Sequence, residues 1–333
     1  MVDGADPGVN GDEIEALTDV EMVSAMAPKA LITLYTAAST DLQFGLFLAM
    51  ERAINDNNVQ ILNISFSECE QDLGASGNQM IAELYQQAAA QGISITVSSG
   101  DSGAASCDGA TVGAVAHNGL AVNGLASTPW NIAVGGTDFD VLYTTDLSII
   151  QKYVKVPGST GQIAGTAPYF TSALGPIPEE PWNDSSTSFT TFAKNAPYYY
   201  GGNSNYMNDL GTGGGASSSA VCLGSVTDSG ACSVRMTGYQ KPAFQTSLSP
   251  VDGVRDLPDV SFFSGVAMSD NGYTSNFTAS WGIYADGKVN ASSGSSYTDC
   301  QVTKASNGAG TGCGATCTPQ YSTMRRKQPL FAI

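Results

Sequence analysis

Residues 59–97 read VQILNISFSECEQDLGASGNQMIAELYQQAAAQGISITV, and this stretch decides the fold. The apolar runs at 59–65 and 93–97 have the length and the β-branched content of buried strands. Between them, 77–91 has the composition of a helix. A strand, a helix and a second strand form a right-handed βαβ unit, so the sequence predicts a parallel sheet.

The flanking segments continue this alternation of helices and strands. We predict helices over 12–27 and 41–56, and strands over 30–35 and 132–134, the last one ended by Gly135-Gly136. The first helix repeats apolar residues every three positions, at Ile14, Leu17, Val20 and Val23. From about 140 to 250, Gly, Ser, Tyr, Asn and Pro dominate and predict long loops, and regular order returns at 255–261. The expected fold class is α/β, a parallel sheet flanked by helices.

The charge balance limits the partners of the chain. Thirty acidic and thirteen basic residues give a net charge of −17, which repels phosphate backbones and disfavours nucleic acid. The sequence has no apolar stretch of 18 residues, so we expect no membrane span. A surplus of carboxylates is either a solubility device or a sign of an acidic working environment.

Seven cysteines and a single histidine exclude a zinc site of the usual spacing. Spaced cysteines with few charges are typical of a secreted protein with disulfides, whose targeting segment we expect outside this chain. Cys69 and Cys107 follow neighbouring strands, and Cys222 and Cys232 enclose a short loop, so we expect two bridges. Cys300 is expected to pair with Cys313 or Cys317.

Three carboxyl groups are candidates for chemistry. Glu15 and Asp19 lie four residues apart on one helix face, either as a solvated acidic face or as a coupled pair with one general base. Asp101 follows a predicted strand, where it either caps a turn or, when protonated, donates to an oxyanion. His117 follows Gly100-Asp101-Ser102-Gly103 in an apolar stretch and is expected to be structural, so a conventional Ser-His-Asp triad is excluded.

Taken together, several stretches resemble the sedolisins, or serine-carboxyl peptidases. They are Glu15-Ala16-Leu17-Thr18-Asp19-Val20-Glu21, Ala27-Pro28-Lys29-Ala30, Ser98-Ser99-Gly100-Asp101-Ser102-Gly103, Ala133-Val134-Gly135-Gly136-Thr137, Trp182-Asn183, Gly213-Gly214-Gly215-Ala216-Ser217 and Pro258-Asp259-Val260-Ser261. The resemblance implies a subtilisin-like fold. It also implies that Glu15 is the base, Asp19 its partner and Asp101 the oxyanion donor, and that Ser65-Phe66-Ser67 contact substrate.

The resemblance further implies how the whole protein would work. Family members hydrolyse peptide bonds in acid through an acyl-enzyme, so the expected partners are a peptide or protein substrate and a propeptide in the full-length precursor. The expected location is extracellular. No cofactor is expected in this chain, and calcium would bind through residues beyond Ile333. On this basis 1–333 is a single incomplete peptidase domain, with a βα core at 3–140, a loop-rich part at 141–254, and a return to the core with an atypical tail at 255–333.

The nucleophile of the family is not recognisable in this sequence. The motif Gly-Thr-Ser-x-x-x-Pro should follow Pro258-Asp259-Val260-Ser261, but alignment on later prolines puts Ala315 or Arg325 at the serine position. Ser322 is the first other serine to test. The chain is therefore expected to be a fragment that lacks both ends of the catalytic domain. Two alternatives stay open, a non-catalytic peptide-binding relative and a damaged gene product, whereas a glycosidase is disfavoured because Glu15 and Asp19 are too close for the inverting geometry.

Overall fold

The structure is a computed structural model that describes residues 4–8, 10, 12–41, 43–108, 116–139, 147–153, 174–183, 211–247 and 250–264. The helices are α1 (Glu13–Met26), α2 (Gly45–Asp56), α3 (Glu70–Gln91) and α4 (Leu147–Tyr153), with a 3₁₀ turn at Ala243–Gln245. The longer strands are β1 (Ile61–Ile64), β2 (Ser94–Ser98), β3 (Ile132–Asp138) and β9 (Val260–Phe263). Two-residue strands are β4 (Glu180–Pro181), β5 (Gly215–Ala216), β6 (Val221–Cys222), β7 (Met236–Thr237) and β8 (Asp256–Leu257).

The main sheet has the order β1-β2-β3, with β9 and β4 also paired to β3. The pairs β1–β2, β2–β3 and β3–β9 are parallel, and β4 is antiparallel. The βαβ unit predicted around 59–97 is confirmed as β1-α3-β2. Because the carboxyl ends of parallel strands lie at one edge, Ser65 and Ser99 follow their strands at the same end of the sheet.

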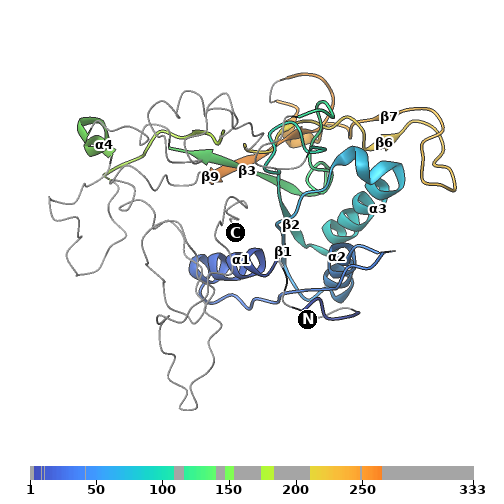
Figure 1. The fold of residues 1–333 in the computed structure, drawn as a ribbon, viewed down its shortest axis with the longest axis horizontal. Coiled ribbons are helices and arrows are strands. Elements are labelled where there is room, and N and C mark those ends of the chain that lie inside the picture. Colours follow the sequence, from blue (N-terminus) through green and yellow to red (C-terminus); the bar gives the residue numbers. More distant parts are fainter. Residues whose placement is uncertain are drawn as a thin grey trace, which may run out of the picture.

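Helices cover both sides of the first two strands (Figure 1). The hydrophobic core joins α2 and α3 to β1 and β2 through Ile54, Ile81, Tyr85, Ile64 and Val97. In Figure 1, α1 lies on the other side of β1 and β2 from α2 and α3. An α/β fold with helices flanking a parallel sheet, as predicted, is therefore what the chain forms.

The strand predicted over 30–35 is wrong. Residues 31–35 belong to no strand in the described part of the chain, and Leu31 is 99% exposed. An apolar run of six residues becomes a strand only where a neighbouring strand accepts its backbone hydrogen bonds. The main sheet ends at β1, which offers this segment no pairing among the described residues.

Two predicted boundaries also differ from the structure. Gly135 and Gly136 do not end β3, because both pair with β9 and a side chain at Gly136 would collide with Ser264. These glycines therefore permit a close approach and mark no turn. Helix α3 begins at Glu70 instead of 77, and a kink at Gly74 (φ 63°, a non-helical backbone) separates its first turn from the rest of the helix. Acidic residues in its first turn favour this earlier start.

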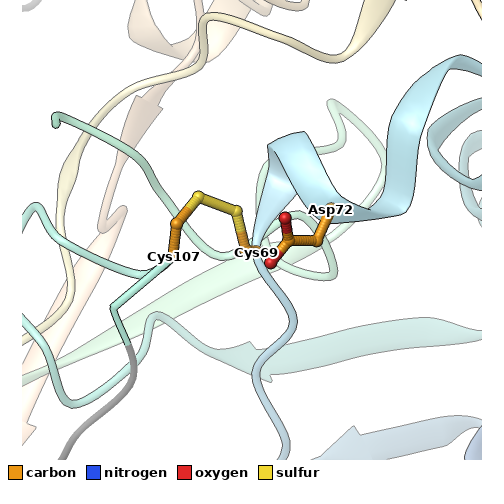
Figure 2. Close-up of side chains that lie close together, drawn as sticks. All are labelled: Cys69, Asp72 and Cys107. Atoms are coloured by element: carbon orange, nitrogen blue, oxygen red, sulfur yellow. A yellow bond between two sulfur atoms is a disulfide. The ribbon is translucent and has the colours of Figure 1, made fainter. Parts of the chain in front are cut away.

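Both expected disulfides are confirmed. Cys69–Cys107 joins the start of α3 to the loop after β2, with 4.8 Å between Cα atoms (Figure 2). Cys222–Cys232 closes a short loop, with 5.4 Å between Cα atoms. Cys300, Cys313 and Cys317 lie outside the described residues.

The loop-rich character predicted for 140–250 fits the described part of that region, where α4 is followed only by two-residue strands and a 3₁₀ turn. The tail after 264 lies outside the described residues. The division of the chain at 140 and 254 stays a prediction. None of the helices that the structure describes combines the length and hydropathy needed to cross a bilayer.

Candidate active site

Helix α1 buries polar side chains. Glu15 is 4% exposed and Thr18 is also buried, whereas Leu17 is 36% exposed. Val20 and Val23 are half-buried, so the apolar repeat does not by itself define the packed face of α1. The helix also turns the Glu15 carboxyl inward. A buried carboxyl group on a helix costs free energy unless neighbouring groups satisfy it, so this face is unlike an ordinary solvated one.

Asp19 reaches the carboxyl end of β1. The Ser65 hydroxyl, which follows β1, donates a hydrogen bond of 2.9 Å to Asp19 Oδ1. Burial raises the pKa of Asp19 from its ordinary 3.8 to about 7, although hydrogen bonds from Ser65 and Asn63 act in the opposite direction. Asp19 is therefore neutral in mild acid and can then act as a hydrogen-bond donor.

Behind Asp19, a chain of side-chain hydrogen bonds crosses the sheet. Thr96 Oγ1 on β2 donates to Asn63 Oδ1 at 2.9 Å, and Asn63 Nδ2 on β1 donates to Ser65 Oγ at 2.9 Å. Ser65 then donates to Asp19. Each donor and acceptor orients the next, so the Asp19 carboxyl is held in one direction.

Asp101 lies three residues after the end of β2. Its backbone is held by a neighbouring loop, because Gly211 N–H donates to the Asp101 carbonyl at 2.8 Å and Gly213 N–H donates to the Gly100 carbonyl at 2.6 Å. Gly100 adopts φ 112°, which favours glycine. A side chain at Gly213 would collide with the Ser99 carbonyl, so the two segments need this glycine to meet.

The predicted site residues thus gather at one edge of the sheet. Asp19 contacts the end of β1, and Asp101 follows the end of β2, which is the adjacent parallel strand with Ile64 paired to Val97. Glu15 is buried one helical turn from Asp19. That Glu15 and Asp19 act on Asp101 or on a common substrate stays a prediction.

The three residues of the expected substrate segment, Ser65-Phe66-Ser67, differ in their contacts. The Ser65 side chain is directed to Asp19, and the Phe66 carbonyl accepts a hydrogen bond of 3.1 Å from Asn123 Nδ2. The Ser67 residue is exposed. Substrate contact by Phe66 and Ser67 stays a prediction, whereas the Ser65 hydroxyl already has a role inside the protein.

Sequence reasoning missed several residues that build this edge. Asn123 is buried and donates to the Ser98 carbonyl at 2.7 Å as well as to Phe66, so it fastens the ends of β1 and β2 together. Asn63 is a polar residue inside an apolar strand pattern, and this was the one feature of the sequence that could have indicated its role. Asn123 gave no such indication, because Ser98 and Phe66, the strand ends that it connects, lie 25 and 57 residues away in sequence.

Other candidates carry no chemistry here. Cys69, Asp72 and Cys107 place potential metal-ligating atoms within 4.8 Å of one another, but both sulfurs are consumed in the disulfide shown in Figure 2. His117 is exposed on a loop, where its backbone N–H donates to Asp108 Oδ1 at 2.7 Å. Ala315, Ser322 and Arg325 lie outside the described residues.

Comparison with known proteins agrees with the resemblance. The chain matches the Subtilase family of peptidases over residues 9–316. It is 40% identical over 108 residues to "Sedolisin" of Pseudomonas sp. (strain 101), which is 30% of this chain and 16% of that protein. It is 33% identical over 144 residues to "Kumamolisin" of Bacillus sp. (strain MN-32), which is 41% of this chain and 24% of that protein. These matches cover about a quarter or less of either relative.

Among solved structures, a Pseudomonas sedolisin (serine-carboxyl proteinase) complexed with pseudo-iodotyrostatin aligns with a TM-score of 0.47 and 23% identity. This alignment covers 79% of the present chain and 57% of the solved one. The family match extends over nearly the whole sequence and includes the helix with Glu15 and the turn with Asp101. The similarity to "Sedolisin" over part of its length agrees with the resemblance seen in the sequence, and the chain belongs to the Subtilase family of peptidases.

Proposed function

We propose that this chain carries the carboxyl groups of an extracellular serine-carboxyl endopeptidase site that works on peptide substrates in acid. The observation that carries the proposal is the buried, inward face of α1, with Glu15 and Asp19 at the sheet edge that also holds Asp101. A merely solvated acidic helix would expose these groups. The propeptide remains part of this proposal for the full-length precursor, as does calcium, whose expected residues lie beyond Ile333.

The proposed chemistry divides the work among the three groups. Glu15, as a carboxylate, takes the proton of an attacking hydroxyl and later passes it to the leaving amine. Neutral Asp19 donates a hydrogen bond that orients Glu15. Protonated Asp101 donates to the oxygen that becomes negative when the carbonyl carbon is attacked. Water then cleaves the acyl-enzyme by the reverse use of the same groups.

This division of work requires acid. Asp19, with its pKa of about 7, is protonated through most of the acid range. Asp101 must also be protonated, because a carboxylate has no proton to donate. A histidine base would be cationic under these conditions and could accept no proton.

A second candidate function is peptide binding without cleavage. The sequence retains the motifs around the site but has no recognisable Gly-Thr-Ser motif after Pro258-Asp259-Val260-Ser261. A chain with an oxyanion donor and no attacking atom would bind a peptide carbonyl and leave it intact.

The role of Asp101 can be tested without turnover. A peptide phosphinate carries a tetrahedral P–O⁻ group that resembles the oxyanion and needs no nucleophile to bind. We expect wild-type protein to bind it at least about tenfold more tightly at pH 4 than at pH 7.5, a difference of about 1.4 kcal/mol. Asp101→Asn, whose amide donates at any pH, should bind at both pH values, and Asp101→Ala at neither. Glu83→Gln makes the same charge change on an exposed part of α3 and is the control.

The results separate the alternatives. Binding that depends on Asp101 in this way supports the oxyanion role for both candidate functions. Equal binding by wild type and Asp101→Ala at pH 4, or no binding by a folded protein, would overturn the proposal. Cleavage of an ordinary peptide, measured in parallel, distinguishes the peptidase from the binding protein.

A further inference from the structure

Glu70 is a fully buried carboxylate that the proposed chemistry does not use. It lies in the first turn of α3, and its Oε1 accepts a hydrogen bond of 2.6 Å from the Ser217 hydroxyl. Its Oε2 accepts backbone hydrogen bonds from Ser218 at 2.8 Å and Ser219 at 2.7 Å. Hydrogen bonds to an ionised acceptor are about twice as strong as those between neutral groups. Glu70 therefore holds the turn 217–219 firmly, across nearly 150 residues of sequence.

The segment just before this turn is hydrogen-bonded to the backbone around Asp101. Residues 211–214 run beside residues 100–103 and exchange backbone hydrogen bonds with them. Gly211 N–H donates to the Asp101 carbonyl, and the Gly103 N–H donates back to the Gly211 carbonyl at 3.1 Å. Any movement of 211–214 therefore moves the backbone on both sides of Asp101.

The residue next to Glu70 holds the chain on the other side of Asp101. Cys69 is bonded to Cys107, which lies in the loop that follows Asp101 (Figure 2). Two consecutive residues at the start of α3 are thus fixed to the loop that follows Asp101 and to the turn that follows the segment 211–214. A purely stabilising buried carboxylate needs no such relation to one turn.

We propose that Glu70 is a positioning residue for Asp101, which acts through the turn 217–219 and the segment 211–214. The inference rests on the proposed role of Asp101 as the oxyanion donor, and it names the support that gives this group its direction. An oxyanion donor has to be aimed within a fraction of an ångström, and this requires a rigid backbone beneath it.

The test compares Glu70→Gln with Glu83→Gln. Both variants exchange a carboxylate for an amide on α3, but Glu83 is exposed and contacts Gln79. Glu70→Gln removes the charge, and because Ser218 and Ser219 share Oε2 while Ser217 donates to Oε1, the new amide NH₂ group faces either the Ser217 hydroxyl or both backbone donors. In Glu70→Gln we expect hydrogen exchange of the Gly211 and Gly213 amides to accelerate about tenfold or more. The exchange rates of the amides that pair β1 with β2 should not change. We also expect the NMR titration of the Asp101 side-chain carbon, assigned with Asp101→Asn, to change its midpoint.

Ser217→Ala serves as a second variant in case Glu70→Gln does not fold. It removes one donor to Glu70 and should produce the same local pattern to a smaller degree. Unchanged exchange at Gly211 and Gly213, or faster exchange spread evenly over the chain with an unchanged Asp101 titration, would overturn the proposal. Neither measurement requires turnover or peptide binding. The positioning role of Glu70 can therefore fail while the oxyanion role of Asp101 holds, and the oxyanion role can fail while the positioning role holds.

Discussion

The Ser65 hydroxyl donates a hydrogen bond of 2.9 Å to Asp19 Oδ1 and so connects α1 to the end of β1 over 46 residues of sequence. Asn63 and Thr96 support this hydroxyl from the sheet. The partner carboxyl of the proposed base is therefore fixed by the sheet itself. The protonation of Asp19 is therefore linked to the stability of the fold, and the first two predictions test this link.

Asp19 should make the protein more stable in acid than at neutral pH. The folded pKa of about 7 lies above the ordinary 3.8, so the folded state holds the proton more tightly. This contribution is complete below about pH 4 and is lost as the pH rises through 7, with a magnitude of at most about 4 kcal/mol. Urea unfolding at pH 4, 5.5 and 7.5 measures it. Asp19→Asn should make the unfolding free energy depend less on pH than it does in the exposed control Asp41→Asn. An equal pH dependence of the unfolding free energy in the two variants would refute the prediction.

Ser65→Ala should move this pH dependence to higher pH. The Ser65 hydrogen bond stabilises the charged form of Asp19, so its loss raises the pKa of Asp19 further. Above pH 7 the variant should also lose about 1 kcal/mol of unfolding free energy, the usual worth of one hydrogen bond. Ser67→Ala changes an exposed serine two residues away and is the matched control. A similar effect of the two substitutions would show that the Ser65 hydroxyl does not act on Asp19.

The two disulfides should differ in their contribution to stability. Cys69–Cys107 closes 38 residues and Cys222–Cys232 closes 10. On loop-closure entropy these bridges stabilise the fold by about 4 and about 3 kcal/mol, respectively. We expect the Cys69→Ser, Cys107→Ser double variant to unfold at lower urea concentration than Cys222→Ser, Cys232→Ser. The reverse order would mean that chain entropy does not control these bridges.

This chain should not hydrolyse peptides at a rate typical of a peptidase. Glu15 can accept a proton and Asp101 can donate one, but neither Ala315 nor Arg325 supplies an attacking atom. Loss of the nucleophile in a subtilisin-type site costs on the order of 10⁶ in kcat. Digestion of casein or haemoglobin from pH 3 to 5 measures the rate. Robust cleavage that Glu15→Ala abolishes would show that an unrecognised serine attacks, and Ser322 would be replaced first.

The sequence predicted those parts of the structure that depend on local pattern. The βαβ unit at 59–97 follows from alternating apolar runs, and it brings Cys69 and Cys107 to one sheet end, so their bridge was predictable. The strand predicted over 30–35 was wrong, because strand formation depends on a neighbouring strand that no local pattern reveals. A pattern of local residues could likewise not show that 135–136 lie inside β3.

The site was predictable only through the recognition of a family. Composition alone left Glu15 and Asp19 as an ordinary acidic pair, since burial of a helix face depends on what packs against it. Glu70 and Asn123 carried no signal, because their roles lie in hydrogen bonds to residues distant in sequence. On α1 the apolar repeat did not identify every buried position, because Glu15 is buried whereas Leu17 is exposed.

The uncovered edge of β1 has a consequence for handling the protein in acid. Within the described part of the chain, β1 pairs with β2 on one side only, and Ile61 is 51% exposed. Such an edge is a template on which another copy can add a strand. At neutral pH a net charge of −17 keeps copies apart, but the isoelectric point near 4.1 removes this repulsion. The colloidal stability of the protein is therefore lowest in the pH range in which its proposed chemistry would operate.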